Sequence, residues 1–184
     1  MRSPTLGFTL IELLVTIAVA GILLAIAVPA FNSFVLNDRD ATQINSLVES
    51  LNYARSMAVK LNTQAGVQVC PSSDGQTCNA PATGWAAGWV VLDMSNPATP
   101  LPIQAVPGLG TVNVLSATGA GANLIVFKSN GSASNAGLPT PAQIKICDPR
   151  GGAFARDVEV SPVGTITSTQ TPGKSATGLA LACP

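Results

Sequence analysis

A long apolar run near the N-terminus constrains the fold of this chain more than any other feature. Residues Phe8–Val28 read FTLIELLVTIAVAGILLAIAV, and Glu12 is the one charged side chain among these twenty-one residues. As an α-helix the run would be about 31 Å long, enough to cross a bilayer hydrocarbon core of about 30 Å. The sequence therefore predicts an N-terminal membrane helix.

Two simple explanations of this run are unsatisfactory. A removed secretory signal peptide has an apolar core of only about 7–15 residues, which is shorter than the run. An ordinary membrane anchor leaves Glu12 unexplained, since a carboxylate within a membrane helix costs about 2.5–3.5 kcal/mol on insertion scales. Glu12 is therefore a candidate functional residue.

The residues around Glu12 resemble the processing signal of type IV prepilins. A short leader, Met1–Gly7, carries one positive charge and ends in glycine; Phe8 follows, and Glu12 lies four positions further on. The resemblance implies that prepilin peptidase cuts between Gly7 and Phe8, and that the new amine of Phe8 is N-methylated. It also implies that Glu12 pairs with the N-terminal amine of a neighbouring subunit in a filament. A buried carboxylate needs such a cationic partner.

The helix is expected to continue past Pro29 as far as Leu61. Pro29 removes one intrahelical hydrogen bond and lies where pilin helices usually kink. From Ala41 onward, apolar residues recur at steps of three and four, with polar residues largely between them. We expect residues 8–36 to lie in the membrane or filament core and residues 37–61 to pack on a sheet.

Residues 62–184 are expected to form a β-rich domain. They are rich in Gly, Pro, Ser, Thr, Asn and Ala, and short β-type runs at roughly ten-residue spacing predict antiparallel strands. These runs are Gln64–Cys70, Gly88–Asp93, Leu101–Val106, Thr111–Leu115, Asn123–Lys128, Gln143–Asp148, Ala155–Ser161, Gly164–Ser168 and Leu179–Cys183. Hairpin turns are expected at Ser129–Ser132 and Pro162–Gly164, and a loop at Ser134–Pro141. One long helix on an antiparallel sheet is an α+β fold, and it matches the type IV pilin architecture.

Motifs along this domain are similar to those of the GspH/FimT group of minor pilins and pseudopilins. They are Val67–Cys70 with Cys78, Gly84–Trp85 with Gly88–Val91, Ile146–Gly151, and Val158–Gly164. The resemblance implies a non-enzymatic protein of the inner membrane, with its C-terminal domain in the periplasm. It would join the major pilin and other minor pilins to prime a pilus near its tip. A type II secretion pseudopilin shares the signal, helix and fold, so that alternative stays open.

Four cysteines in an exported domain predict two disulfides. Three pairings are possible, and we favour Cys70–Cys78 and Cys147–Cys183. A zinc site is the alternative, but the chain has no histidine and no C-x-x-C motif. We expect no metal and no cofactor.

Two other groups of residues have competing interpretations. Trp85 and Trp89 could form a contact surface for another subunit; we favour Trp89 packing on the helix and Trp85 covering a loop. Asp157 and Glu159 would share one face of a strand, and paired carboxylates can hydrolyse glycosides only across a cleft. A solvated strand face is the favoured interpretation, and with no histidine the sequence indicates no enzyme.

DNA is a further candidate partner, because some members of the GspH/FimT group bind it during natural transformation. Those members carry a Gly-Arg-x-Arg motif, whereas Gly164–Thr167 of this chain has neither arginine. The cations that could converge instead are Lys128, Lys145, Arg150, Arg156 and Lys174. They are interleaved with acids and would neutralise few phosphates, so DNA is not favoured.

Overall fold

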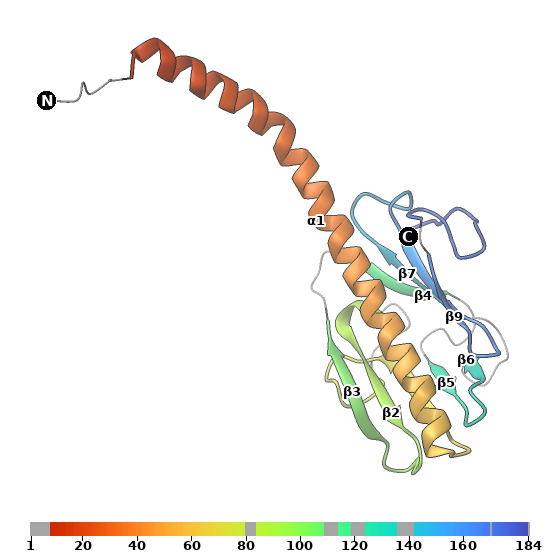
Figure 1. Ribbon diagram of the computed structural model, residues 1–184. Coiled ribbons are helices and arrows are strands. Elements are labelled where there is room, and N and C mark those ends of the chain that lie inside the picture. Colours follow the sequence, from red (N-terminus) through yellow and green to blue (C-terminus); the bar gives the residue numbers. More distant parts are fainter. Residues whose placement is uncertain are drawn as a thin grey trace, which may run out of the picture. The chain divides into compact units, whose positions relative to one another are not determined.

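The computed structural model describes residues 8–79, 84–108, 114–118, 124–135, 142–169 and 171–183. Gly7 and the rest of the expected leader lie outside these residues. The chain forms two compact units that divide between Asp38 and Arg39, which we call the N-terminal unit and the globular unit. One helix, α1 (Leu10–Leu61), contributes to both (Figure 1).

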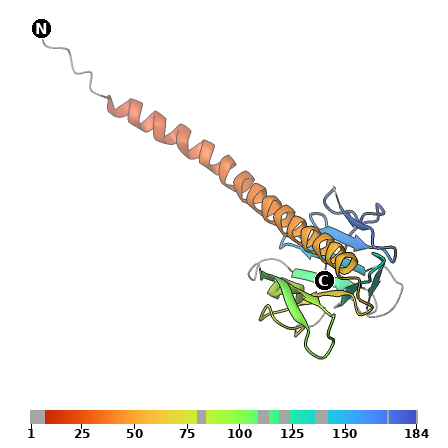
Figure 2. The ribbon, with the colours of Figure 1, turned by 60° about the horizontal axis from the view of Figure 1, so that its bottom comes forward.

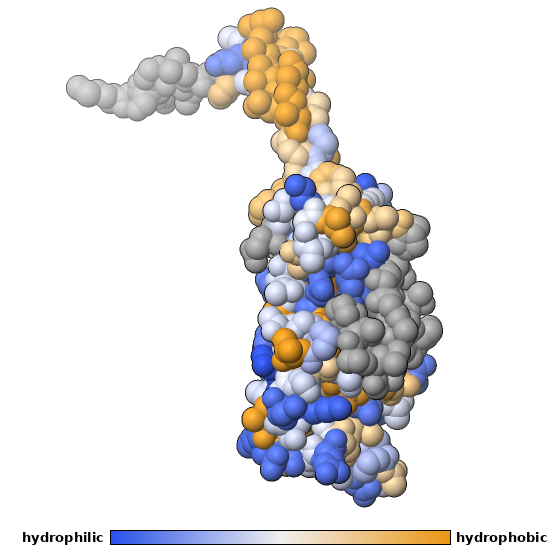
Figure 3. Space-filling model, turned by 90° about the vertical axis from the view of Figure 1, so that its right-hand side faces the viewer, coloured by the Kyte–Doolittle hydropathy of each residue, from blue (hydrophilic) through white to orange (hydrophobic). Residues whose placement is uncertain are grey.

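The N-terminal unit is helical and its side chains are exposed. Thr9 caps α1, because its Oγ1 accepts a hydrogen bond of 3.3 Å from the Glu12 N–H. Every residue from Phe8 to Phe34 is exposed, and Figure 3 shows a largely apolar surface along this segment. By length and composition α1 can cross a membrane. The helix continues through Pro29; a kink there stays a prediction.

The globular unit places the second half of α1 against two antiparallel sheets (Figure 2). The first sheet has the order β3 (Leu101–Pro107), β2 (Gly88–Asp93), β1 (Val67–Pro71), β5 (Ile125–Phe127), β6 (Ala133–Asn135). The second has the order β4 (Val114–Thr118), β7 (Ala142–Cys147), β8 (Arg156–Val160), β9 (Ile166–Ser168). A short 3₁₀ helix, η1 (Gly84–Ala87), precedes β2. The expected α+β fold, with one long helix packed on antiparallel strands, is confirmed, with two sheets in place of one.

The core lies between the helix and both sheets. The helix contributes a buried stripe at steps of three and four, as its sequence predicts; the stripe consists of Ile44, Leu47, Leu51, Ala54 and Ala58. Val69 and Phe127 of the first sheet and Ile144 and Val158 of the second belong to the same apolar cluster. One core therefore holds the helix to both sheets.

Both expected hairpin turns form, and they contact each other. Lys128 N–H donates to the Ser132 carbonyl in the β5–β6 turn, and Gly164 N–H donates to the Ser161 carbonyl in the β8–β9 turn. Gly164 has a φ of +81°, and a Cβ there would collide with the Gly131 carbonyl of the other turn. This position therefore requires glycine for both its conformation and its close contact.

Two sequence-based assignments are wrong. Leu179–Cys183 is not a strand: it holds one isolated bridge, from Ala180 to Lys174. Conversely, Ala133–Asn135 pairs with β5 as strand β6, although Ser134–Pro141 was expected to be a loop. In both segments the structure depends on hydrogen-bonded pairing with a neighbouring strand more than on the local pattern of apolar residues.

Candidate functional site

Glu12 and Phe8 lie at the start of α1, where the sequence places the processing and docking residues. Phe8 is 79% exposed, and Glu12 is exposed in the first helical turn, three residues after the capping Thr9. A carboxylate in this turn is favoured by the helix dipole. Glu12 forms no ion pair with any other residue that the structure describes.

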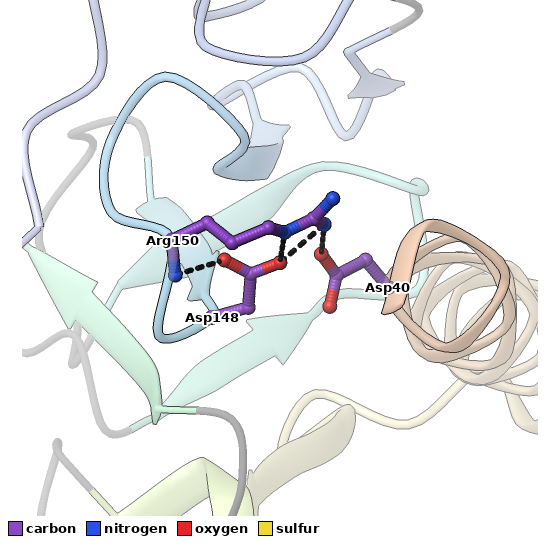
Figure 4. A network of polar contacts seen from close by, with 3 residues as sticks. All are labelled: Asp40, Asp148 and Arg150. Atoms are coloured by element: carbon purple, nitrogen blue, oxygen red, sulfur yellow. Dashed lines mark hydrogen bonds and ion pairs between the residues drawn. The ribbon is translucent and has the colours of Figure 1, made fainter. Parts of the chain in front are cut away.

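A second charged cluster, missed by the sequence analysis as a site, lies in the globular unit (Figure 4). Arg150 Nε donates to Asp148 Oδ2 at 2.7 Å, and its Nη2 forms an ion pair with the same oxygen. That Nη2 also lies 3.7 Å from Asp40 Oδ2. The guanidinium stacks over Phe154, with 4.2 Å from Cζ to the ring centroid. Arg150 thus bridges α1 and the β7–β8 connection.

The two carboxylates are buried, at 1% exposure for Asp40 and 6% for Asp148. Burial and the neighbouring Asp148 carboxylate raise the pKa of Asp40 to about 6, while Arg150 and Arg156 act to lower it. Asp40 and Asp148 share Arg150, so these three side chains together carry one net negative charge when both acids are ionised. A signal in the sequence could have found Asp40, which precedes Ile44 by four residues and so falls in register with the buried stripe.

Mild acid is expected to stabilise the globular unit through Asp40. The pKa of Asp40 in the folded state is about 6, against an ordinary 3.8. The stabilisation that protonated Asp40 gives the folded state is therefore fully present below pH 4 and is lost as pH rises through 6. Lowering the pH from 7 to 5 should add about 1 kcal/mol to the free energy of unfolding. Guanidinium denaturation of the full chain in micelles measures this. Asp40→Asn should remove the gain, and an unchanged pH profile in that variant would contradict the assignment.

In the structure Cys70 is bonded to Cys78 and Cys147 to Cys183, the two pairs favoured from the sequence. Within the described residues no group of three or more His, Cys, Asp or Glu side chains could hold a metal ion.

The loop closed by Cys70 and Cys78 is held together by Asp74. Its carboxylate accepts hydrogen bonds from the backbone N–H groups of Gln76 and Thr77, and from the hydroxyls of Thr77 and Ser72. These bonds, led by those from the backbone, hold the pKa of Asp74 well below its usual range. The carboxylate is thus engaged within its own turn.

Both tryptophans are fully buried, which excludes a contact surface made by their side chains. Trp89 Nε1 donates to Ser50 Oγ on α1 at 2.9 Å, so its expected packing on the helix is confirmed. Trp85 belongs to η1 and to the main core cluster, so the expectation that it covers a loop is wrong.

The solvated-face interpretation of Asp157 is wrong. Asp157 is fully buried, where Gln143 Nε2 donates to its Oδ2 at 2.7 Å and the Thr169 hydroxyl hydrogen-bonds its Oδ1. Thr169 reaches it because the chain after β9 stays paired with β8. Glu159 is partly exposed. Asp157 is therefore a satisfied structural carboxylate.

Two of the five candidate DNA-contacting cations already have protein partners. Arg150 binds Asp148 and Asp40, and Lys145 Nζ donates to the Ala182 carbonyl at 3.2 Å. The charge of Arg150 is therefore already balanced by carboxylates, whereas Lys145 keeps its charge because its hydrogen-bond partner is a neutral carbonyl.

Two protein-family models match this chain, and together they cover most of its length. The family model described as type II transport protein GspH matches residues 43–164. The chain belongs to the GspH family. The prokaryotic N-terminal methylation motif matches residues 2–28 of this GspH-family chain, which implies processing by prepilin peptidase and association with other pilins.

Solved structures show the same fold. The type IV minor pilin FimU of Pseudomonas aeruginosa matches with a TM-score of 0.55 at 19% identity, over 75% of this chain and 98% of FimU. In a second crystal form FimU gives a TM-score of 0.54 over 70% of this chain and 91% of FimU. The GspH-family chain therefore has the type IV pilin fold.

Curated relatives are similar over a shorter stretch. The type IV major fimbrial protein FimA of Dichelobacter nodosus is 36% identical over 77 residues, which cover 42% of this chain and 45% of FimA. A fimbrial protein of the same organism is 36% identical over 76 residues, or 40% of this chain and 43% of that protein. The chain thus spans about half the length of the curated relatives it matches.

Proposed function

We propose that this chain is a minor type IV pilin that helps to prime pilus assembly in a complex with other minor pilins at or near the tip. Prepilin peptidase would cut between Gly7 and Phe8, and Phe8 would be N-methylated. The observation that carries the proposal is the exposed apolar segment of α1 with Glu12 as its single charge. Such a surface requires cover by lipid before assembly and by other apolar helices afterwards.

The globular unit fits export to the periplasm, with the N-terminal helix in the inner membrane. Its four cysteines form two disulfides, and such bonds persist in an oxidising compartment.

The main test of the priming role is the amount of surface-sheared major pilin in a strain that lacks the gene. Loss of filaments, restored by the wild-type gene, supports priming, whereas normal filament numbers would remove that role.

Glu12→Ala is expected to abolish restoration of filaments while membrane insertion and leader cleavage stay normal. Insertion should not suffer, because removing a carboxylate from an apolar helix lowers its transfer cost. Assembly should suffer, because the N-terminal amine of the neighbouring subunit loses its counter-charge. Asp38→Ala removes an exposed acid of α1 outside the apolar run and is the matched control. Full restoration by Glu12→Ala would contradict the docking role.

A type II secretion pseudopilin is the second candidate, and the description of the matching family model favours it. The same deletion strain separates the two. A drop in secreted enzyme with normal pili would identify a pseudopilin, and the opposite pattern a pilin.

A further inference from the structure

The second sheet ends in a strand whose outer edge is unpaired within the described part of the chain. That strand is β9, which neighbours β8 on one side. Just beyond it, Thr169 N–H donates to the Asp157 carbonyl, and the register sets Val158 opposite Ser168. Hydrogen-bonded pairs alternate along an antiparallel ladder, so the N–H and carbonyl of Ser168 do not face β8. They point outward, away from the sheet.

The same alternation applies to Ile166, two residues earlier. At the turn of this hairpin Ser161 N–H donates to the Thr165 carbonyl, so Ile166 also lies between hydrogen-bonded pairs. The outward backbone groups of Ile166 and Ser168 form no hydrogen bond with any described residue. The free edge therefore presents a donor and an acceptor every two residues, a repeat of about 6.8 Å.

This edge lacks the features that usually prevent strand pairing. Thr165–Thr169 reads TITST, without proline or charge, whereas β3, at an edge of the first sheet, contains Pro102 and Pro107. Proline has no N–H to donate and charged side chains disfavour pairing, and edge strands commonly use both to avoid other chains. The edge of β9 is thus able to accept a further strand.

A groove lies alongside β9. It has a volume of about 550 Å³ and is lined by Glu159 of β8, Thr167 and Ser168 of β9, and residues 174–178 of the C-terminal segment. Most of the lining side chains carry a hydroxyl group, and Glu159 and Lys174 bring one charge of each sign. The groove therefore selects no charged ligand, and the specific element beside it is the backbone of β9.

An extended peptide segment matches this edge. Along one side of a β-strand an N–H and a carbonyl recur every two residues, which is the period set by Ile166 and Ser168. Nucleic acids, lipid headgroups and saccharides do not have this repeat. We propose that an extended segment of a neighbouring pilin subunit pairs with β9 as a further strand of the second sheet. The identity of the partner as a pilin rests on the function proposed above.

Hydrogen exchange of the full chain tests this pairing without any substitution. The chain is measured alone in micelles, and in its complex with other minor pilins purified from the producing strain. The N–H groups of Ile166 and Ser168 should exchange about tenfold or more slowly in the complex than in the chain alone. Those of Thr167 and Thr169, which donate to β8, should be protected in both samples. Unchanged exchange of Ile166 and Ser168 would overturn the proposal.

A proline substitution tests the backbone of the edge directly. Ser168→Pro removes an N–H that points outward, and sheets tolerate proline at such positions. It should lower the amount of pilin that co-purifies with the chain about tenfold or more. Ser168→Ala keeps the N–H and removes the hydroxyl, so this matched control should leave the amount unchanged. Equal losses in the two variants would show recognition of the side chain, contrary to the proposal. If Ser168→Pro loses the protection of Thr167 and Thr169, its fold is disturbed and the wild-type exchange measurement decides.

The outcomes separate this inference from the proposed function. If pili require the gene and pilins co-purify, but Ile166 and Ser168 stay unprotected, the priming role stands and the strand pairing fails. If these two N–H groups are protected in a complex with pseudopilins and pili are normal in the deletion strain, the priming role fails while the strand pairing stands. Protection that appears in the chain alone as its concentration rises would indicate self-pairing through β9 and would overturn the proposal.

Discussion

Arg150→Met is expected to lower the free energy of unfolding of the globular unit by about 3–5 kcal/mol at pH 7, the range found when one partner of a buried ion pair is removed. The substitution leaves Asp40 and Asp148, both buried, without the cation that they share. It also removes the stacking on Phe154. The loss should be smaller at pH 5, because protonation of Asp40 relieves the repulsion between the two acids.

The measurement is guanidinium denaturation of the full chain in micelles, followed by tryptophan fluorescence. Both tryptophans are fully buried in the globular unit, so their emission reports on that unit. Lys60→Met removes an exposed cation of α1 and is the matched control. Adding Asp40→Asn to Arg150→Met should recover part of the loss, since one acid then remains. A loss below 1 kcal/mol for Arg150→Met would contradict the shared-cation assignment.

The sequence predicts those parts of the fold that depend on local periodicity. The stripe from Ile44 to Ala58 is buried as expected, because a helix repeats every 3.6 residues whatever it packs against. Strand β2 has the predicted bounds, Gly88–Asp93. The two turns at Gly131 and Gly164 follow from glycine's access to positive φ.

What the sequence misses depends on neighbours that are distant along the chain. The sequence predicts a solvated face for Asp157, because alternation along one strand does not reveal that Thr169 covers its carboxylate. The ion pair of the buried Asp40 is not indicated by the sequence, because its partner Arg150 lies far away along the chain. Gln104 is similar: only the packing of β3 shows that its Oε1 is buried without a donor. Each of these three polar groups is defined by tertiary contacts.

Loss of the Cys147–Cys183 disulfide should destabilise the globular unit more than loss of Cys70–Cys78. The first bond joins residues 36 apart and the second residues 8 apart. Chain entropy in the unfolded state gives about 4 kcal/mol for the longer loop and about 2.5 kcal/mol for the shorter one. The longer bond also holds a C-terminal segment that is not a strand and has few other ties, among them the Lys145 contact with Ala182.

Cys147→Ala/Cys183→Ala and Cys70→Ala/Cys78→Ala are the matched pair for this comparison, measured by the same denaturation. Hydrogen exchange locates the effect. In the first variant the Leu181 N–H, which donates to the Gly173 carbonyl, should lose protection while the N–H groups of β1 keep theirs. Because the shorter loop is also held by the hydrogen bonds of Asp74, its variant should keep a local structure close to that of the wild type. An equal or larger loss of stability in the Cys70→Ala/Cys78→Ala variant would show that loop length does not govern the contribution of these bonds.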